Sequence, residues 1–380
     1  MARHSSLLGR RRQRITTAKL NVLDARPFSP HPKFSPDRCS GVLFGLDPRA
    51  NFTLRSPLAN ICAMKIVFSR KGVDSQAGKL FSAIINERLV SIPIPAGEGD
   101  KSKTRYRDLT IDGVSLGRLV EELSIRRNKK DRRCADELLH FDPDLRRESL
   151  KRKPGWRPLL GLGSKEAQRI AQNGVGKGDL FLFFGPLRAV QKDWAGRYRY
   201  AGPKQHLIHG WLQISGVLKA RPSRRTTVPE WMRYHPHFLN DFGEQNTVYV
   251  ATQRLSLPGL RLRLPGGGSF ERRDLKLCLT APGGSMSYWR LPFTVRPHDG
   301  KYPMSRFETE HRWTPGRKCT FLDTNIGYWQ DEVLDSSKCR GAVDWLVHLF
   351  DDNRISVSNP TRLPRIGLVR LGGPRRSPAR

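Results

Sequence analysis

The chain has 380 residues, of which 37% are hydrophobic, and a formal net charge of +33. This length allows one large or two ordinary domains, with a core that needs no disulfide or structural metal. No run of the sequence approaches the roughly 20 apolar residues of a membrane helix, so we expect a soluble protein with no membrane partner.

The two ends of the chain differ from its middle. Residues 1–63 are rich in Arg, Ser and Pro, hold 11 Lys and Arg against 3 Asp and Glu, and have no sustained hydrophobic period. Residues 351–380 return to a similar composition, with 7 basic against 2 acidic residues. We predict disordered basic tails at both ends, although an upstream-extended reading frame would also explain residues 1–63. A single core is expected over residues 64–350, beginning at Met64.

The core keeps much of the positive charge. Residues 64–350 hold 50 basic against 30 acidic residues, so this region is expected to attract nucleic acid or nucleotides in a salt-dependent way. An Arg-rich composition without such a role is the alternative. The six cysteines have neither zinc-knuckle nor redox-pair spacing, which indicates reduced thiols and a cytoplasmic location. They are Cys39, Cys62, Cys134, Cys278, Cys319 and Cys339.

Short strands separated by turn residues dominate the core, and helices are few. Apolar runs with β-branched and aromatic residues predict the strands. These lie at residues 65–69, 89–95, 180–185, 206–214, 247–252, 275–280, 289–293 and 320–323. Apolar residues at helical spacing predict helices at 115–125, 164–172 and 342–350. The pattern favours an α+β fold whose strand-rich core is a partly open β-barrel with a few helices.

The first predicted strand runs directly into a polar loop. Ser69, Arg70 and Lys71 precede Gly72, so a hydroxyl, two cations and backbone N–H groups beside a flexible glycine could hold a phosphate. The loop matches neither the P-loop nor the dinucleotide-binding fingerprint. An ordinary solvated turn is the alternative.

Two short loops concentrate groups that could carry chemistry. His140, Asp142 and Asp144 lie within five residues, and hard divalent cations favour such oxygen-rich groups. His235 and His237 could add ligands or a general base. We predict that these five residues form a catalytic site, with a divalent metal on the first three. The alternatives are a helix-stopping turn for the first loop and a polar, proline-stiffened loop for the second.

Two further segments have a distinctive composition. Residues 186–205 interleave cations with aromatic residues and suit an exposed hairpin over a polyanion. Residues 265–270 contain three successive glycines, which predict a mobile hairpin tip.

In their order along the chain, these segments resemble the nucleotide modification associated domain 3 family, a bacterial and phage group named for its association with DNA-base modification systems. The resemblance runs from Met64 to about Phe350. It rests on residues 64–75, 89–95, 106–108, 140–144, 178–185, 206–214, 231, 235–237, 246–251 and 289–293. Val73 and Lys79 depart from it, because an aromatic residue and a glycine are expected there. The resemblance implies a role near modified nucleotides and leaves the reaction open.

The strand pair 180–185 and 206–214 is also similar to the hairpins of PUA-like domains, small barrels that read modified bases. This similarity implies that aromatic side chains stack on a base while cations meet phosphates. The stacking candidates are Trp194, Tyr198 and Trp211, and the additional phosphate-binding candidates are Arg188, Arg197 and Arg199.

Three functions are compatible with the sequence. The first is binding of a nucleotide or nucleic acid that carries a modified base, within a base-modification or phage-conflict system. The second is a metal-dependent or acid/base enzyme that acts on a nucleotide or modified base. The third is an interaction scaffold that binds polyanions through its basic tails. The sequence identifies no protein partner.

Overall fold

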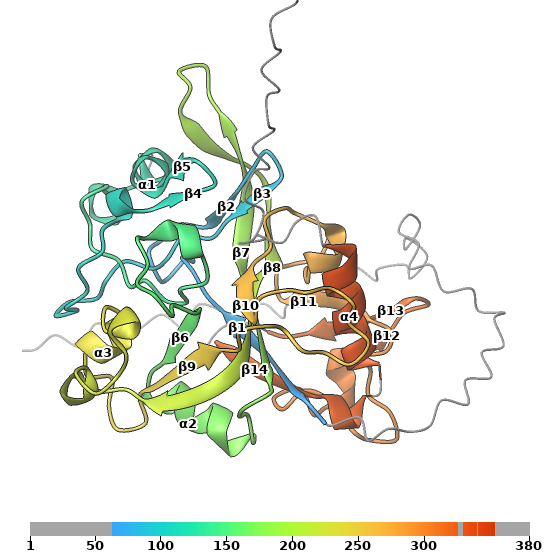
Figure 1. Cartoon of the computed structure of the whole chain (residues 1–380). Helices are drawn as coiled ribbons and strands as arrows, with labels where there is room; N and C mark the ends of the chain where they lie inside the picture. Colours follow the sequence, from blue (N-terminus) through green and yellow to red (C-terminus); the bar gives the residue numbers. More distant parts are fainter. Residues whose placement is uncertain (1–62, 126, 326–329, 340, 354–380) are drawn as a thin grey trace, which may run out of the picture. The chain divides into compact units, whose positions relative to one another are not determined.

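The structure is a computed structural model that describes residues 63–125, 127–325, 330–339 and 341–353. These residues form a 9-stranded mixed sheet, a 3-stranded sheet, a 2-stranded hairpin and a few helices (Figure 1). Apart from residues 63 and 351–353, the predicted tails lie outside the described residues. Within the described ranges, no helix is long and apolar enough to cross a membrane.

The large sheet forms the centre of the described core. Its strands are β1 (Lys65–Arg70), β2 (Ser82–Ile85), β3 (Arg88–Val90), β6 (Leu159–Leu162), β7 (Leu180–Lys192), β8 (Tyr198–Lys219), β9 (Thr247–Ala251), β10 (Gly267–Ser269) and β14 (Asp331–Asp335). The main path runs β14-β1-β7-β8-β9-β6, with β2 also on β7, β3 on β2 and β10 on β8. Strands β1 and β2 pair with β7 in parallel, and the other pairs are antiparallel.

The smaller elements surround this sheet. The second sheet has the order β11 (Tyr288–Pro292), β13 (Cys319–Asp323), β12 (Trp313–Pro315). The hairpin consists of β4 (Thr110–Ile111) and β5 (Val114–Ser115). The helices are α1 (Leu116–Ser124), α2 (Ser164–Gln172), the single turn α3 (Pro236–Leu239) and α4 (Ala342–Asp352). Ser115 begins α1 as its N-cap, because its Oγ accepts a hydrogen bond from the Arg118 amide.

Both faces of the large sheet are buried. Side chains alternate between the faces of a strand, and on β1 Ile66 and Phe68 join the cluster that contains the apolar face of α4. Val67 lies on the opposite face, in a cluster with Ala167 and Ile170 of α2. This double coverage explains why β7 begins with a continuous apolar run instead of an alternating one.

The prediction of a strand-rich α+β fold with an incompletely closed sheet is confirmed. Three local predictions differ from the structure. The strand predicted at residues 89–95 ends at Val90, as β3. Residues 275–280 do not form a strand: Leu275–Leu277 is a single 3-10 turn, which Asp274 caps by accepting a hydrogen bond from the Lys276 amide. The predicted mobile glycine tip is the buried strand β10. A Cβ on Gly268 would lie 2.9 Å from the Trp211 ring, so the glycine is needed for this packing.

Glu332 on β14 gives the fold a pH dependence. Burial raises the pKa of this carboxyl from 4.5 to about 7, against the opposing effects of the Arg306 amide and the charges of Arg169 and Arg306. Between these two values the folded protein holds a proton that the unfolded chain has released, so stability falls as the pH rises through this window. Above this pH window, ionisation of Glu332 lowers the free energy of unfolding by about 3 kcal/mol.

We therefore expect Glu332→Gln to be more stable than the wild type at pH 8 and to lose this advantage near pH 5. Urea unfolding at both pH values measures the difference. Glu310→Gln, at an exposed position, controls for the loss of one charge. An equal stability difference between Glu332→Gln and the wild type at the two pH values would contradict the proposed ionisation.

Candidate functional site

A cavity of about 580 Å³ lies where three distant segments of the chain meet. The end of β1 and the turn after it contribute Arg70 and Lys71. The loop that precedes β6 contributes His140 and Asp142, and α3 contributes His237. The cavity thus brings together residues from the first polar loop and from both histidine-containing loops.

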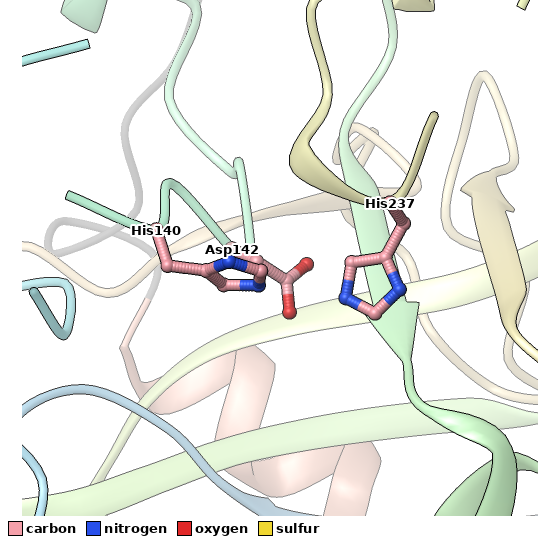
Figure 2. A group of neighbouring side chains, drawn as sticks. All are labelled: His140, Asp142 and His237. Carbon is pink, nitrogen blue, oxygen red and sulfur yellow. The ribbon is translucent and has the colours of Figure 1, made fainter. Parts of the chain in front are cut away.

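At one wall of the cavity, His140, Asp142 and His237 each present one donor atom, and the three atoms lie within 4.8 Å of one another. Figure 2 shows the Asp142 carboxylate between the two imidazole rings. Donor atoms bound to one ion at about 2.0–2.2 Å lie roughly 3 Å apart. Small side-chain rotations would therefore close the group around a metal.

Hydrogen-bond partners orient the two imidazole rings for binding a metal. His140 Nδ1 lies 3.1 Å from Asp100 Oδ2, and His237 Nδ1 hydrogen-bonds Asn246 Oδ1. Because a carboxylate and an amide oxygen accept hydrogen bonds, both Nδ1 atoms are assigned as protonated, which leaves each Nε2 lone pair free for a metal. Burial lowers the pKa of His237 to about 3, so this ring is neutral at physiological pH.

The two carboxylates of this arrangement remain ionised. Burial alone would raise the pKa of Asp142, but the charge of Lys71 and contact with His235 outweigh it and hold the pKa well below its usual range. Likewise, hydrogen bonds from His140 and neighbouring groups outweigh the effect of burial on Asp100 and lower its pKa.

Asp142 is held on both sides. Its Oδ1 accepts a 2.6 Å hydrogen bond from the Gly161 amide and lies 3.2 Å from His235 Nε2, while Oδ2 lies 3.6 Å from Lys71 Nζ. His235 Nε2 is buried beside this carboxylate and has no other hydrogen-bond partner among the described residues. An ionised carboxylate can accept about four hydrogen bonds or ligand contacts, so these contacts leave room for a metal.

Two imidazoles and one carboxylate make a mixed donor set. Imidazole suits Zn, Cu, Fe and Ni, whereas carboxylate also suits harder ions, and a 2-His-1-carboxylate set with open positions is characteristic of non-haem iron. The three donors lie on one side of the open cavity, so solvent or a substrate could complete the coordination. Such a site could polarise a substrate oxygen or activate a water molecule.

The rest of the cavity is more acidic than basic. Besides the two histidines, its lining has six carboxylates and three cations. The carboxylates belong to Asp74, Glu98, Asp100, Asp142, Glu166 and Asp241, and the cations to Arg70, Lys71 and Lys101. Phe242 adds an aromatic surface, with its ring centroid 4.7 Å from that of His237 and 5.6 Å from that of His140.

The predicted phosphate loop is largely occupied by internal contacts. Ser69 is fully buried on β1 and does not line the cavity. The Arg70 guanidinium lies 4.0 Å from Asp74, and Lys71 faces Asp142. The amides of Arg70, Lys71, Val73 and Asp74 all donate to backbone oxygens. The loop is therefore a wall of the cavity, and its side chains would bind a phosphate only by exchanging these carboxylates.

In each of the two loops, one predicted catalytic residue lies away from the cavity. Asp144 does not line this cavity: its carboxylate is fully buried and accepts two 2.6 Å hydrogen bonds from Arg152. Asp144 thus pairs with Arg152 and lies outside the group formed by His140, Asp142 and His237. His235 is also fully buried and lies behind Asp142, while His237 reaches the cavity.

The proposed base-stacking and hairpin residues lie away from the cavity. Trp211 is fully buried between Phe270 and Phe350, so it offers no face to a base. Trp194 is 94% exposed at the turn of the β7–β8 hairpin, which extends beyond the large sheet (Figure 1). Tyr198 begins β8 beside this turn.

The cations of this hairpin are already engaged. Arg197 and Arg199 both pair with Asp193, at 3.5 and 3.1 Å. Arg188 donates to the Gly202 carbonyl and lies over the Tyr200 ring. This part of the predicted phosphate surface is thus partly neutralised.

Sequence reasoning missed four residues that shape the candidate site. Asp100 and Asn246 orient the imidazoles, Gly161 holds Asp142, and Phe242 packs on both rings. They are an ordinary acid, amide, glycine and aromatic residue, scattered over almost 150 positions, and no local spacing links them to the histidine loops. Their role follows from the tertiary structure alone.

The fold and the cavity define an α+β protein with a largely buried His-Asp-His group suited to a divalent metal. Residues 65–335 match the family described as nucleotide modification associated domain 3, and the chain belongs to this family. The resemblance seen in the sequence is thereby confirmed, together with an association with nucleotide modification. No curated protein and no solved structure matches the chain. The PUA-like similarity stays a prediction.

Proposed function

We propose that this protein is a metal-dependent enzyme that acts on the base of a nucleotide or nucleic acid. The observation that carries the proposal is the convergence of His140, Asp142 and His237 on one cavity, with both imidazoles oriented by partners behind them. Family membership supports a substrate related to nucleotide modification. We infer that the substrate carries a modified base, that the protein works within a base-modification or phage-conflict system, and that it is located in the cytoplasm.

The charges of the cavity favour entry of the base over entry of the phosphate. Six carboxylates outweigh three cations and the two charges of a bound divalent metal by one unit, so the cavity would still repel a phosphate dianion. Two of the cations also already face carboxylates. A neutral base would avoid this repulsion, could pack on Phe242, and could place a polar edge toward the metal. The metal would supply Lewis-acid activation there, and the residues of this chain would hold and orient the base.

Metal analysis of the purified full-length chain tests the proposal. We expect about one equivalent of a divalent metal after reconstitution, because the described residues contain one such three-ligand group. We expect at least a tenfold weaker affinity in Asp142→Asn, which loses the charged ligand. Asp241→Asn is the matched control, since it removes another carboxylate of the same cavity outside the ligand group. Equal metal affinity of Asp142→Asn and the wild type would refute the metal site.

A second measurement separates an enzyme from a reader of modified bases. Metal-loaded and metal-free protein are compared for binding and for chemical change of nucleosides and oligonucleotides with ordinary and modified bases. Metal-dependent conversion is the expected result. Binding that is equally tight without metal, with no conversion, would favour the reader.

A further inference from the structure

A second cavity, of about 600 Å³, has the opposite charge. Five cations and one carboxylate line it. The cations are Lys151, Arg152, Lys153, Arg225 and Arg233. We name this second cavity the basic groove.

Three of these cations have no acidic partner among the residues that the structure describes. Arg152 is held by Asp144, and Lys153 pairs with Glu230. Within the described ranges, Lys151, Arg225 and Arg233 form no ion pair. Arg225 and Arg233 donate from Nε to backbone oxygens, which fixes their direction while leaving their charge uncompensated. The groove thus offers preoriented positive charge to an anion.

Aromatic side chains lie among these cations. Trp156, Trp231 and Tyr234 line the groove. Trp156 and Tyr234 are tied to Asp144 and Arg152, whereas Trp231 is half-buried and lies 5.9 Å from the Arg157 guanidinium. Proteins bind single-stranded nucleic acids with this combination of groups: the cations contact phosphates, and the aromatic faces stack on bases.

Two segments of the chain line both the basic groove and the cavity that holds His140, Asp142 and His237, which we call the metal cavity. In the first segment, Lys101 lines the metal cavity and Thr104 lines the groove. In the second segment, His237 lines the metal cavity and Tyr234 lines the groove. Each pair is three residues apart, so its Cα atoms are separated by at most about 11 Å. Since stacked nucleotides rise about 3.4 Å each, a strand of a few nucleotides could reach both cavities.

We propose that the basic groove binds the backbone of a single-stranded nucleic acid whose target base enters the metal cavity. The part concerning the target base rests on the proposed function, whereas strand binding by the groove does not. Charge divides the substrate between the two cavities: the phosphates lie in the basic groove and the base enters the acidic cavity. A single strand is favoured because its bases are free to leave the stack, which a duplex permits only at the cost of unpairing.

Fluorescence anisotropy of the full-length protein tests the groove. The probe is a labelled single strand of about twelve nucleotides, within the 4–16 nucleotides of known single-strand sites, in DNA and RNA forms. We expect Lys151→Ala/Arg225→Ala to weaken binding about tenfold near 0.1 M salt and to reduce the slope of log K against log salt by about 1.4, for two lost phosphate contacts. Both residues are exposed, so the fold should tolerate the changes.

Lys177→Ala/Arg261→Ala is the matched control. It removes one exposed lysine and one exposed arginine that line neither cavity, and we expect it to change binding less than twofold. The tails contribute equally to every variant, so differences in slope report the core. Trp231→Ala should weaken binding about 5- to 150-fold, the range of one lost stacking contact.

The outcomes distinguish this inference from the metal proposal. Binding is measured in EDTA and in Mn²⁺. Groove-dependent binding by a protein that binds no metal would support the inference and refute the proposed function. Metal binding, with the groove variants and the control binding the strand alike, would refute the inference alone. A duplex bound as tightly as the single strand, with the same loss in the groove variants, would also overturn it.

Discussion

Gly161→Ala is expected to disrupt the candidate metal site. A Cβ at this position would lie 2.1 Å from His237 Cδ2 and 2.4 Å from Nε2, far inside van der Waals contact. His237 is 4% exposed and its ring is held by Asn246, so the ring cannot swing away without breaking this contact. We expect at least a tenfold loss of metal affinity and about 1–3 kcal/mol of destabilisation from overpacking, measured by metal titration and urea unfolding.

Gly163→Ala controls for the same substitution in the same wall. The nearest atom to a Cβ there is Phe242 Cβ at 3.9 Å, and the backbone angles of −67° and 166° suit alanine. Gly163 is the N-cap of α2, where alanine is less favourable than glycine, so a cost below about 1 kcal/mol is expected with unchanged metal affinity. Equal metal affinity in the Gly161→Ala and Gly163→Ala variants would show that the position of His237 does not determine binding.

The sequence predicted those parts of the fold that depend on local patterns. The apolar run of residues 180–185 and the helical spacing of residues 342–350 each identify a buried element without knowledge of its neighbours. Pairing is different, because β1 joins β7 in parallel across more than a hundred residues. The pairing of β1 with β7 is determined by packing of the whole core. Parallel strands are not joined by a short turn, so no local turn sequence predicts this pairing.

The candidate site illustrates the same limit at the level of single residues. Composition drew attention to the loops 140–144 and 235–237, and both do contribute to the cavity. Within each loop, residues two positions apart have different surroundings: Asp142 reaches the cavity while Asp144 meets Arg152, and His237 reaches it while His235 lies behind. Which member faces the cavity depends on contacts with other parts of the chain, such as the Gly161 amide of β6 for Asp142 and the Asn246 side chain for His237.

Asp144→Ala is expected to cost about 3–5 kcal/mol of folding stability, the range for breaking a buried ion pair. The Asp144 carboxylate is fully buried, and the side chain of its partner Arg152 is 4% exposed. Both carboxylate oxygens accept from Arg152 at 2.6 Å, and Tyr234 and Trp156 donate to Oδ2. Removal of the carboxylate leaves a buried guanidinium without its counterion and the Tyr234 phenol without its acceptor, while the Trp156 indole keeps only the Tyr234 oxygen. Urea unfolding measures the loss.

Two comparisons separate the buried pair from a general effect of charge. Lys153→Ala breaks the exposed pair with Glu230 and should cost less than about 1 kcal/mol. Asp144→Leu/Arg152→Met removes both buried charges and should be less destabilised than the sum of the single changes. Asp144→Asn, examined under conditions where it stays folded, should keep the metal. If Asp144→Asn were as stable as the wild type and lost the metal, Asp144 would belong to the metal site, and the ion pair with Arg152 would not be its main role.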